Sequence, residues 1–152
     1  MNRVAMYRVA LWLALAGAVA ACAPSAPASY ETIASTYHVT LTADQLSAAG
    51  ATRVIQLVGE GTWQMELSPD GKAHVSQRND LGFTPRVEAA YELVGARFTF
   101  QETGDIAFSC VDEKAVGRYD WKLDGGLLTL ALVEDGCDRR FVLSTLPWER
   151  QP

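Results

Sequence analysis

The strongest constraint on the fold is the alternation of polar and large apolar residues between residues 117 and 132. The sequence Asp124-Gly125-Gly126 interrupts this alternation with a turn signal, and the alternation resumes beyond it. Strict alternation on both sides of a glycine turn predicts a β-hairpin with one buried face. The apolar positions of this hairpin are Tyr119, Trp121, Leu128, Leu130 and Leu132.

Similar patterns predict further strands in the ranges 37–41, 61–68, 73–75, 87–93, 97–101 and 141–144. Thr42 has the chemistry of a helix N-cap, which predicts a short helix over 43–49 that ends at Gly50. The range 53–58 fits either a strand or a continuing turn, and we favour the strand. The range 77–85 predicts a polar loop.

Seven or eight antiparallel strands joined mostly by tight turns, with one short helix near the start, place the chain in the all-β class. Closing such strands on themselves removes the exposed sheet edges. We therefore expect a small antiparallel up-and-down β-barrel, with a two-sheet sandwich as the alternative.

The first residues have the pattern of an export signal. Arg3 and Arg8 precede an uncharged apolar run, Val9–Ala21, which is too short to span a bilayer comfortably. The sequence Val19-Ala20-Ala21-Cys22 resembles the bacterial lipobox, which implies cleavage before Cys22 and lipidation of that cysteine. The alternative is an ordinary signal peptide cut nearby, with Cys22 left as a free thiol.

These features divide the chain into a signal peptide (1–21), a lipidated flexible tether (22–36) and a barrel domain (37–152). The tether is small, polar and contains proline, without apolar periodicity. The resemblance implies a cell-envelope protein attached to the membrane through Cys22. Ala23 after the cysteine favours the periplasmic side of the outer membrane in an organism with two membranes.

The charge of the chain restricts its partners. Removing residues 1–21 takes away Arg3 and Arg8 and no acid, so 11 basic and 18 acidic residues remain and the net charge is −7. Nucleic acids need a basic face, so we expect no nucleic-acid partner. Attraction to anionic headgroups by charge alone is disfavoured for the same reason.

Three short motifs resemble those of lipocalins and related calycins. Gly61-x-Trp63 opens a strand after a short helical segment, as the glycine and tryptophan of that family do, and Arg140 precedes the predicted last strand. The resemblance implies that Arg140 packs over Trp63 in a cation–π contact. The series Gly117-x-Tyr119-x-Trp121 also looks like small bacterial lipocalin-like lipoproteins. The chain lacks a Thr-Asp-Tyr motif and is shorter than a typical lipocalin.

With Cys22 assigned to lipid, Cys110 and Cys137 form an even pair in an oxidising compartment, which predicts a disulfide. We expect no metal, no cofactor and no catalytic residue. His38 and His74 fit solvated strand positions, and the acidic residues Glu134, Asp135 and Asp138 fit a solvated turn better than a calcium site.

The aromatic residues expected inside the barrel fit either a packed core or a ligand pocket, because eight strands enclose little space. Our first hypothesis is a non-enzymatic protein that binds a small apolar ligand. The alternative is an envelope module that binds another protein, for example an inhibitor of a metalloprotease or of lysozyme. The candidate ligand-binding residues are Trp63, Tyr91, Phe98, Tyr119 and Trp121, with Phe100 as a further inward ring.

Overall fold

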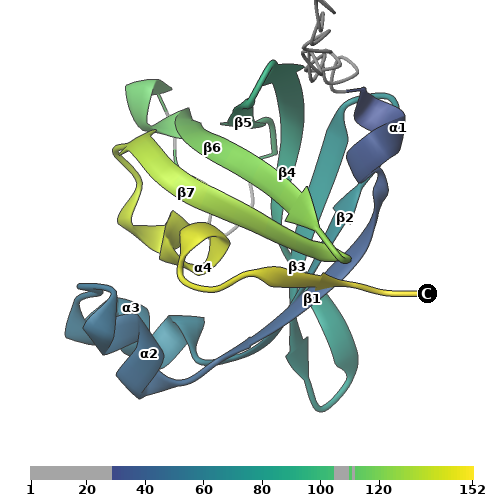
Figure 1. Cartoon of the computed structure of the whole chain (residues 1–152). Coiled ribbons are helices and arrows are strands. Elements are labelled where there is room, and N and C mark those ends of the chain that lie inside the picture. The colour runs from purple at the N-terminus through teal and green to yellow at the C-terminus, as the bar shows by residue number, and fades with distance from the viewer. Residues whose placement is uncertain (1–28, 105–109, 111) are drawn as a thin grey trace, which may run out of the picture.

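The computed structural model describes residues 29–104, 110 and 112–152, and in it eight antiparallel strands close into a barrel (Figure 1). Each strand pairs with the next in sequence, and the last pairs with the first. This confirms the predicted up-and-down barrel. The strands are β1 (Ser35–Leu41), β2 (Gly61–Leu67), β3 (Lys72–Asn79), β4 (Gly82–Val94), β5 (Arg97–Glu102), β6 (Val116–Asp124), β7 (Leu127–Asp135) and β8 (Trp148–Arg150).

Alternation along the strands fills the barrel interior, as the sequence predicts. On β2, Trp63, Met65 and Leu67 are buried, whereas Glu66 between them is exposed. Met65 lies opposite Tyr37 of β1 and Val75 of β3, so inward residues of neighbouring strands meet in register. Burying these apolar side chains supplies the main driving force for closing the barrel.

Short helices connect or flank the strands: α1 (Tyr30–Ile33), α2 (Ala43–Ala48), α3 (Arg53–Gly59), α4 (Phe141–Ser144) and the 3-10 turns η1 (Asp112–Ala115) and η2 (Asp138–Arg140). The predicted helix after Thr42 is confirmed as α2. Thr42 and Gln45 form a reciprocal capping box at its start. No helix among the described residues is both long and apolar enough to cross a membrane.

The predicted strand over 53–58 is wrong, because these residues form α3. The hydroxyl of Thr52 accepts the backbone N–H of Ile55, which caps a helix. Ile55 and Gly59, four residues apart, are buried. This spacing lies on one face of a helix, not on one face of a strand.

The predicted strand over 141–144 is also wrong, because these residues form α4. Val142 and Leu143 are both buried, which adjacent residues of a half-buried strand cannot achieve. The last strand is instead β8, whose Trp148 is fully buried.

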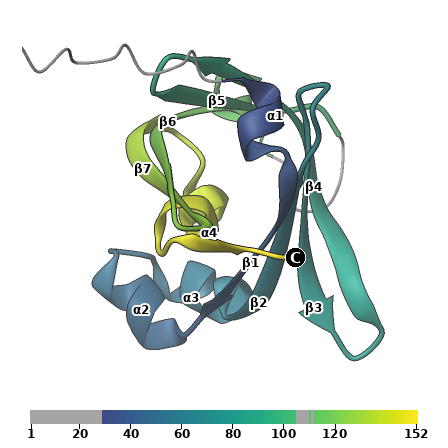
Figure 2. The ribbon, with the colours of Figure 1, turned by 45° about the vertical axis from the view of Figure 1, so that its right-hand side comes forward.

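The predicted polar loop over 77–85 is wrong, because β3 and β4 stay paired up to Asn79 and Gly82 around a two-residue turn. Figures 1 and 2 show this hairpin projecting beyond the barrel. A projecting hairpin has no core to cover, so most of its side chains can be polar, with Leu81 and Phe83 as the exceptions.

The two ends of the barrel differ. The helix-capped end carries α2, α3, α4, η2 and the β3–β4 hairpin tip, whereas the turn end carries the turns β2–β3, β4–β5 and β6–β7 together with α1 (Figures 1 and 2). The described fold starts before the expected boundary at Tyr37. Ile33 of α1 is fully buried, and the rings of Tyr30 and Tyr91 lie 5.3 Å apart.

Candidate functional site

The predicted ligand-binding aromatics lie mostly in one buried stack. The ring centroids of Tyr91 and Phe98 are 5.4 Å apart, and those of Phe98 and Tyr119 are 6.4 Å apart. Trp63 is also buried. Trp121 is only half-buried, and its indole N–H donates to the carbonyl of Gly95 at the turn end.

The polar tips of these rings are used within the protein. The Trp63 indole N–H donates to the Gly59 carbonyl at 2.7 Å, and the Tyr91 hydroxyl donates to the Ser68 carbonyl at 2.7 Å. Burial is also the main cause that raises the pKa of Tyr91, to about 12. These groups therefore stabilise the barrel wall instead of facing a ligand.

Little space is left beside Trp63. The cavity that it lines with Phe100, Leu143 and Arg140, among others, has a volume of about 20 Å³. That volume holds about one water molecule. In this part of the described interior the rings form a packed core.

Arg140 lines the same cavity as Trp63, but its strongest contacts are to two carboxylates. Its Nη1 lies 2.6 Å from Glu102 Oε1, its Nη2 lies 2.5 Å from Asp135 Oδ1, and its Nε lies 2.7 Å from Asp135 Oδ2. Nη1 also donates to the Ala115 carbonyl at 3.0 Å. The predicted cation–π contact to Trp63 stays a prediction.

These three charged side chains are almost completely removed from solvent. Their exposed fractions are 3% for Arg140, 1% for Glu102 and 5% for Asp135. The Tyr119 hydroxyl donates to the Asp135 carboxylate as well. Charges this deeply buried must be paired and hydrogen-bonded, and the charges of Arg140, Glu102 and Asp135 are. The network of these residues joins the ends of β5, β6 and β7 to η2.

Burial sets the pKa directions within this network. Burial alone lowers the pKa of Arg140, but the hydrogen bonds and charge of Asp135 outweigh it, so the pKa of Arg140 is raised. Burial raises the pKa of Glu102 more than the Cys110 N–H and Arg140 lower it. Burial, followed by the neighbouring charge of Asp135, raises the pKa of Tyr119. Arg140 therefore stays charged.

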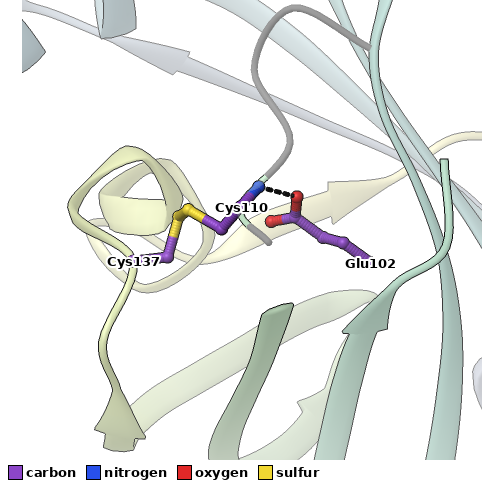
Figure 3. A group of neighbouring side chains, drawn as sticks. All are labelled: Glu102, Cys110 and Cys137. Carbon is purple, nitrogen blue, oxygen red and sulfur yellow. Dashed lines mark hydrogen bonds between the residues drawn. A yellow bond between two sulfur atoms is a disulfide. The ribbon is translucent and has the colours of Figure 1, made fainter. Parts of the chain in front are cut away.

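The predicted disulfide between Cys110 and Cys137 is confirmed, with their Cα atoms 6.1 Å apart (Figure 3). The Cys110 N–H donates to the Glu102 carboxylate, and the Cys137 N–H donates to Asp135 Oδ1 at 2.8 Å. The disulfide thus holds in place the two backbone N–H groups that donate to the carboxylates of Glu102 and Asp135, which Arg140 also binds.

Ligand atoms of Glu102, Cys110 and Cys137 gather within 4.8 Å of one another. Both sulfurs belong to the disulfide, so they offer no thiolate to a metal.

The acidic residues weighed as a calcium site are separated by their own ion pairs. Glu134 pairs with Arg118 at 2.8 Å on the surface, and Asp135 pairs with the buried Arg140. The histidines lie on the outside of the barrel. His38 is bonded to Gln64 at 2.9 Å, and His74 is exposed opposite Glu66 and Glu88.

Most of the exposed large apolar side chains lie on elements that reach the helix-capped end. Of the seven in the described residues, five lie there and two lie at the turn end. The five are Val54 and Leu57 on α3, Leu81 at the β3–β4 tip, and Leu132 and Val133 on β7. The sequence pattern does not predict these exposed positions, because it assigns 53–58 to a strand and 77–85 to a polar loop.

No family model, no curated protein and no solved structure matches this chain. The closed eight-stranded barrel is compatible with the calycin-like fold that the motifs resemble. Cys22 and the predicted signal peptide lie outside the described residues.

Proposed function

We propose that the protein is a non-enzymatic, lipid-anchored module of the cell envelope that binds another protein with its helix-capped end. The observation that carries this proposal is that Val54 and Leu57 of α3 and Leu81 of the β3–β4 tip, all strongly exposed, lie on elements of that end. Apolar surface exposed at one end of a protein makes that end a candidate interaction site.

The packed interior favours this reading over the binding of a small apolar ligand. A ligand inside the barrel would have to displace buried rings such as Phe98 and Tyr119, which are completely buried. Opening a core of this kind costs several kcal/mol per large side chain. The outer surface needs no such rearrangement.

The position of the predicted anchor supports the same proposal. The described chain begins next to α1 at the turn end (Figure 1). An anchor attached before α1 would therefore join the described chain at the turn end, which leaves the helix-capped end free to meet a partner.

Charge indicates the kind of partner. The net charge of −7 after removal of residues 1–21 favours a basic protein, since opposite charges speed association and select among partners. Lysozyme, a basic enzyme of the kind that small envelope barrels inhibit, is the first partner to test, and a secreted metalloprotease is the second.

The test is biolayer interferometry with the immobilised full chain, with lysozyme, a metalloprotease and an acidic protein as analytes. We expect saturable binding to a basic analyte that weakens as salt is raised. A parallel titration measures uptake of an environment-sensitive apolar dye. Stoichiometric dye uptake without binding to any protein would contradict the proposal and restore the small-ligand hypothesis.

A further inference from the structure

Three side chains that can bind a metal gather at the disulfide. One ligand atom each from Glu102, Cys110 and Cys137 lies within 4.8 Å of the other two (Figure 3). While the disulfide is intact, its sulfurs offer a cation no thiolate. We infer that reduction of this disulfide by a dithiol converts the three side chains into a Zn²⁺ site, in which both thiolates and the Glu102 carboxylate are the ligands.

The geometry requires only small movements of the side chains. With Zn–S bonds of about 2.3 Å and Zn–O bonds of about 2.1 Å, a tetrahedral ion holds its ligand atoms about 3.6 to 3.8 Å apart. A carboxylate oxygen of Glu102 already lies within 4.8 Å of both sulfurs. After reduction, rotation about the Cα–Cβ bonds separates the two sulfurs while the cysteine Cα atoms stay 6.1 Å apart. The fourth position of the ion is left for a water molecule.

Glu102 is held in the orientation that a metal ligand needs. Its Oε1 accepts from Arg140 Nη1 at 2.6 Å, and its Oε2 accepts from the Cys110 backbone N–H. A carboxylate has about four acceptor positions, so each oxygen keeps one for an ion. Carboxylates that bind metals are commonly fixed by such hydrogen bonds. The Glu102 side chain is 1% exposed, so its two protein partners set its orientation.

The buried charge of the region is the same with the disulfide as with the metal. Arg140, Glu102 and Asp135 together carry one negative charge. Two thiolates and one divalent cation add no net charge to these three groups. Asp135 takes two contacts of the guanidinium, at Nη2 and Nε, so the Glu102 carboxylate shares its charge with only one nitrogen of Arg140. The site can therefore accept a divalent cation without burying additional charge.

The ligand set selects zinc among the common ions. Thiolates are soft ligands, which Mg²⁺ and Ca²⁺ do not use, whereas a carboxylate is a hard ligand that does not suit Cu⁺. Zn²⁺ accepts both cysteine sulfur and carboxylate oxygen. The sequence spacing does not reveal this set, because Glu102 is eight residues from Cys110 and the cysteines are 27 residues apart.

The exposure of the two cysteines indicates how the disulfide is opened. Cys110 is half-buried, whereas Cys137 is 4% exposed, so a thiolate of the dithiol attacks the Cys110 sulfur and Cys137 leaves as the thiolate. The second thiol of the dithiol then attacks the mixed disulfide and releases Cys110. The dithiol is oxidised to its own disulfide by two electrons, and Zn²⁺ displaces any proton on the two cysteines to solvent.

The experiment uses the full chain with Cys22→Ser throughout, so that only Cys110 and Cys137 can supply thiolates. The chain is reduced with dithiothreitol without oxygen, desalted, and titrated with Zn²⁺ in competition with a chromophoric chelator. The oxidised chain and the variant with both remaining cysteines replaced by serine are the controls for the sulfurs. Glu102→Gln tests the carboxylate, and Glu134→Gln is its matched control, because Glu134 is 70% exposed.

We expect one Zn²⁺ per reduced chain, and none in the oxidised chain or the serine variant. Glu102→Gln should weaken zinc binding at least about tenfold, while Glu134→Gln leaves the affinity unchanged. Co²⁺ in place of Zn²⁺ should show thiolate-to-metal charge-transfer absorption. Zinc should raise the melting temperature of the reduced chain, measured by circular dichroism, and leave that of the oxidised chain unchanged.

Several results would overturn the inference. These are zinc affinity of the reduced chain no higher than that of the serine variant, wild-type affinity in Glu102→Gln, and one ion shared between two chains. Zinc that binds the reduced chain without restoring its folded circular dichroism spectrum would also contradict it, because the ligands would then not be held by the fold. None of these results bears on partner binding at the helix-capped end, so the proposed function is tested separately.

Discussion

Replacing Arg140 with leucine should be among the most damaging single changes in the barrel. The substitution would leave the carboxylates of Glu102 and Asp135, which are 1% and 5% exposed, without their cation. Removing one member of a buried ion pair costs about 3 to 5 kcal/mol. This loss is a large fraction of the about 5 to 15 kcal/mol of stability that domains of this size have in total. It should lower the melting temperature by about 10 to 20 °C.

The matched control is Arg118→Leu. Arg118 pairs with Glu134 at 2.8 Å, but their side chains are 47% and 70% exposed. Exposed pairs contribute about 0 to 1 kcal/mol, so this variant should unfold close to the wild type. Arg140→Lys keeps the charge but not the two-pronged contact to Asp135, and should fall between the two.

The penalty in Arg140→Leu should also depend on pH. Burial already raises the pKa of Glu102 above its ordinary value of 4.5, and loss of the Arg140 charge should raise it further. A carboxyl whose pKa is raised in the folded state stabilises that state at low pH, and this contribution is lost as pH rises through the folded-state pKa. The destabilisation should therefore be smaller at pH 4.5 than at pH 7.

The assay is urea unfolding of wild type and variants at both pH values, followed by tryptophan fluorescence. A loss below about 1 kcal/mol in Arg140→Leu at pH 7, or a penalty that grows on acidification, would refute the reasoning.

Three further predictions concern other parts of the molecule. Gly117→Ala should destabilise the domain by about 2 kcal/mol or more in the same assay, because the added Cβ would lie 2.5 Å from Asp135 Oδ2 and 2.8 Å from the Tyr119 hydroxyl; wild-type stability would show that the network shifts freely. Replacing Cys110 and Cys137 together with serine should cost about 3 to 4 kcal/mol, from the entropy of a loop that spans 27 residues; an unchanged urea midpoint would contradict this. Cys22→Ser should move the protein from the membrane to the soluble fraction and remove its lipid mass, and unchanged membrane fractionation would count against lipidation.

The parts of the fold that the sequence predicted have local causes. The hairpin around Gly125 and Gly126 follows from alternation and from two glycines, which both adopt positive φ. The helix α2 follows from the Thr42 cap. In each of these cases the determining residues lie within about fifteen positions of one another.

The parts that escaped prediction depend on contacts between distant residues. Glu102 and Arg140 are 38 residues apart, and nothing near Glu102 in the sequence distinguishes it from an exposed strand residue. The short helices α3 and α4 are fixed by packing at one end of the barrel, where the Cβ of an alanine at Gly59 would approach Leu46 to 3.1 Å.

The glycine at position 117 is recognisable in the sequence, but the contact that requires it is not. The series Gly117-x-Tyr119 resembles a family motif, but the reason for the glycine is the close approach of the Asp135 carboxylate and the Tyr119 ring. That approach involves β7, so the sequence of β6 alone could not supply it.

The central claim is that a packed barrel works from the outside of its helix-capped end, and hydrogen–deuterium exchange of the full chain with and without the basic protein that it binds tests this claim most directly. The account predicts that the partner slows exchange in 53–59 and around 79–83 and leaves the turn end unchanged. Protection confined to α1 and the turns of the opposite end, or slower exchange of the inward strands on adding an apolar ligand, would contradict it.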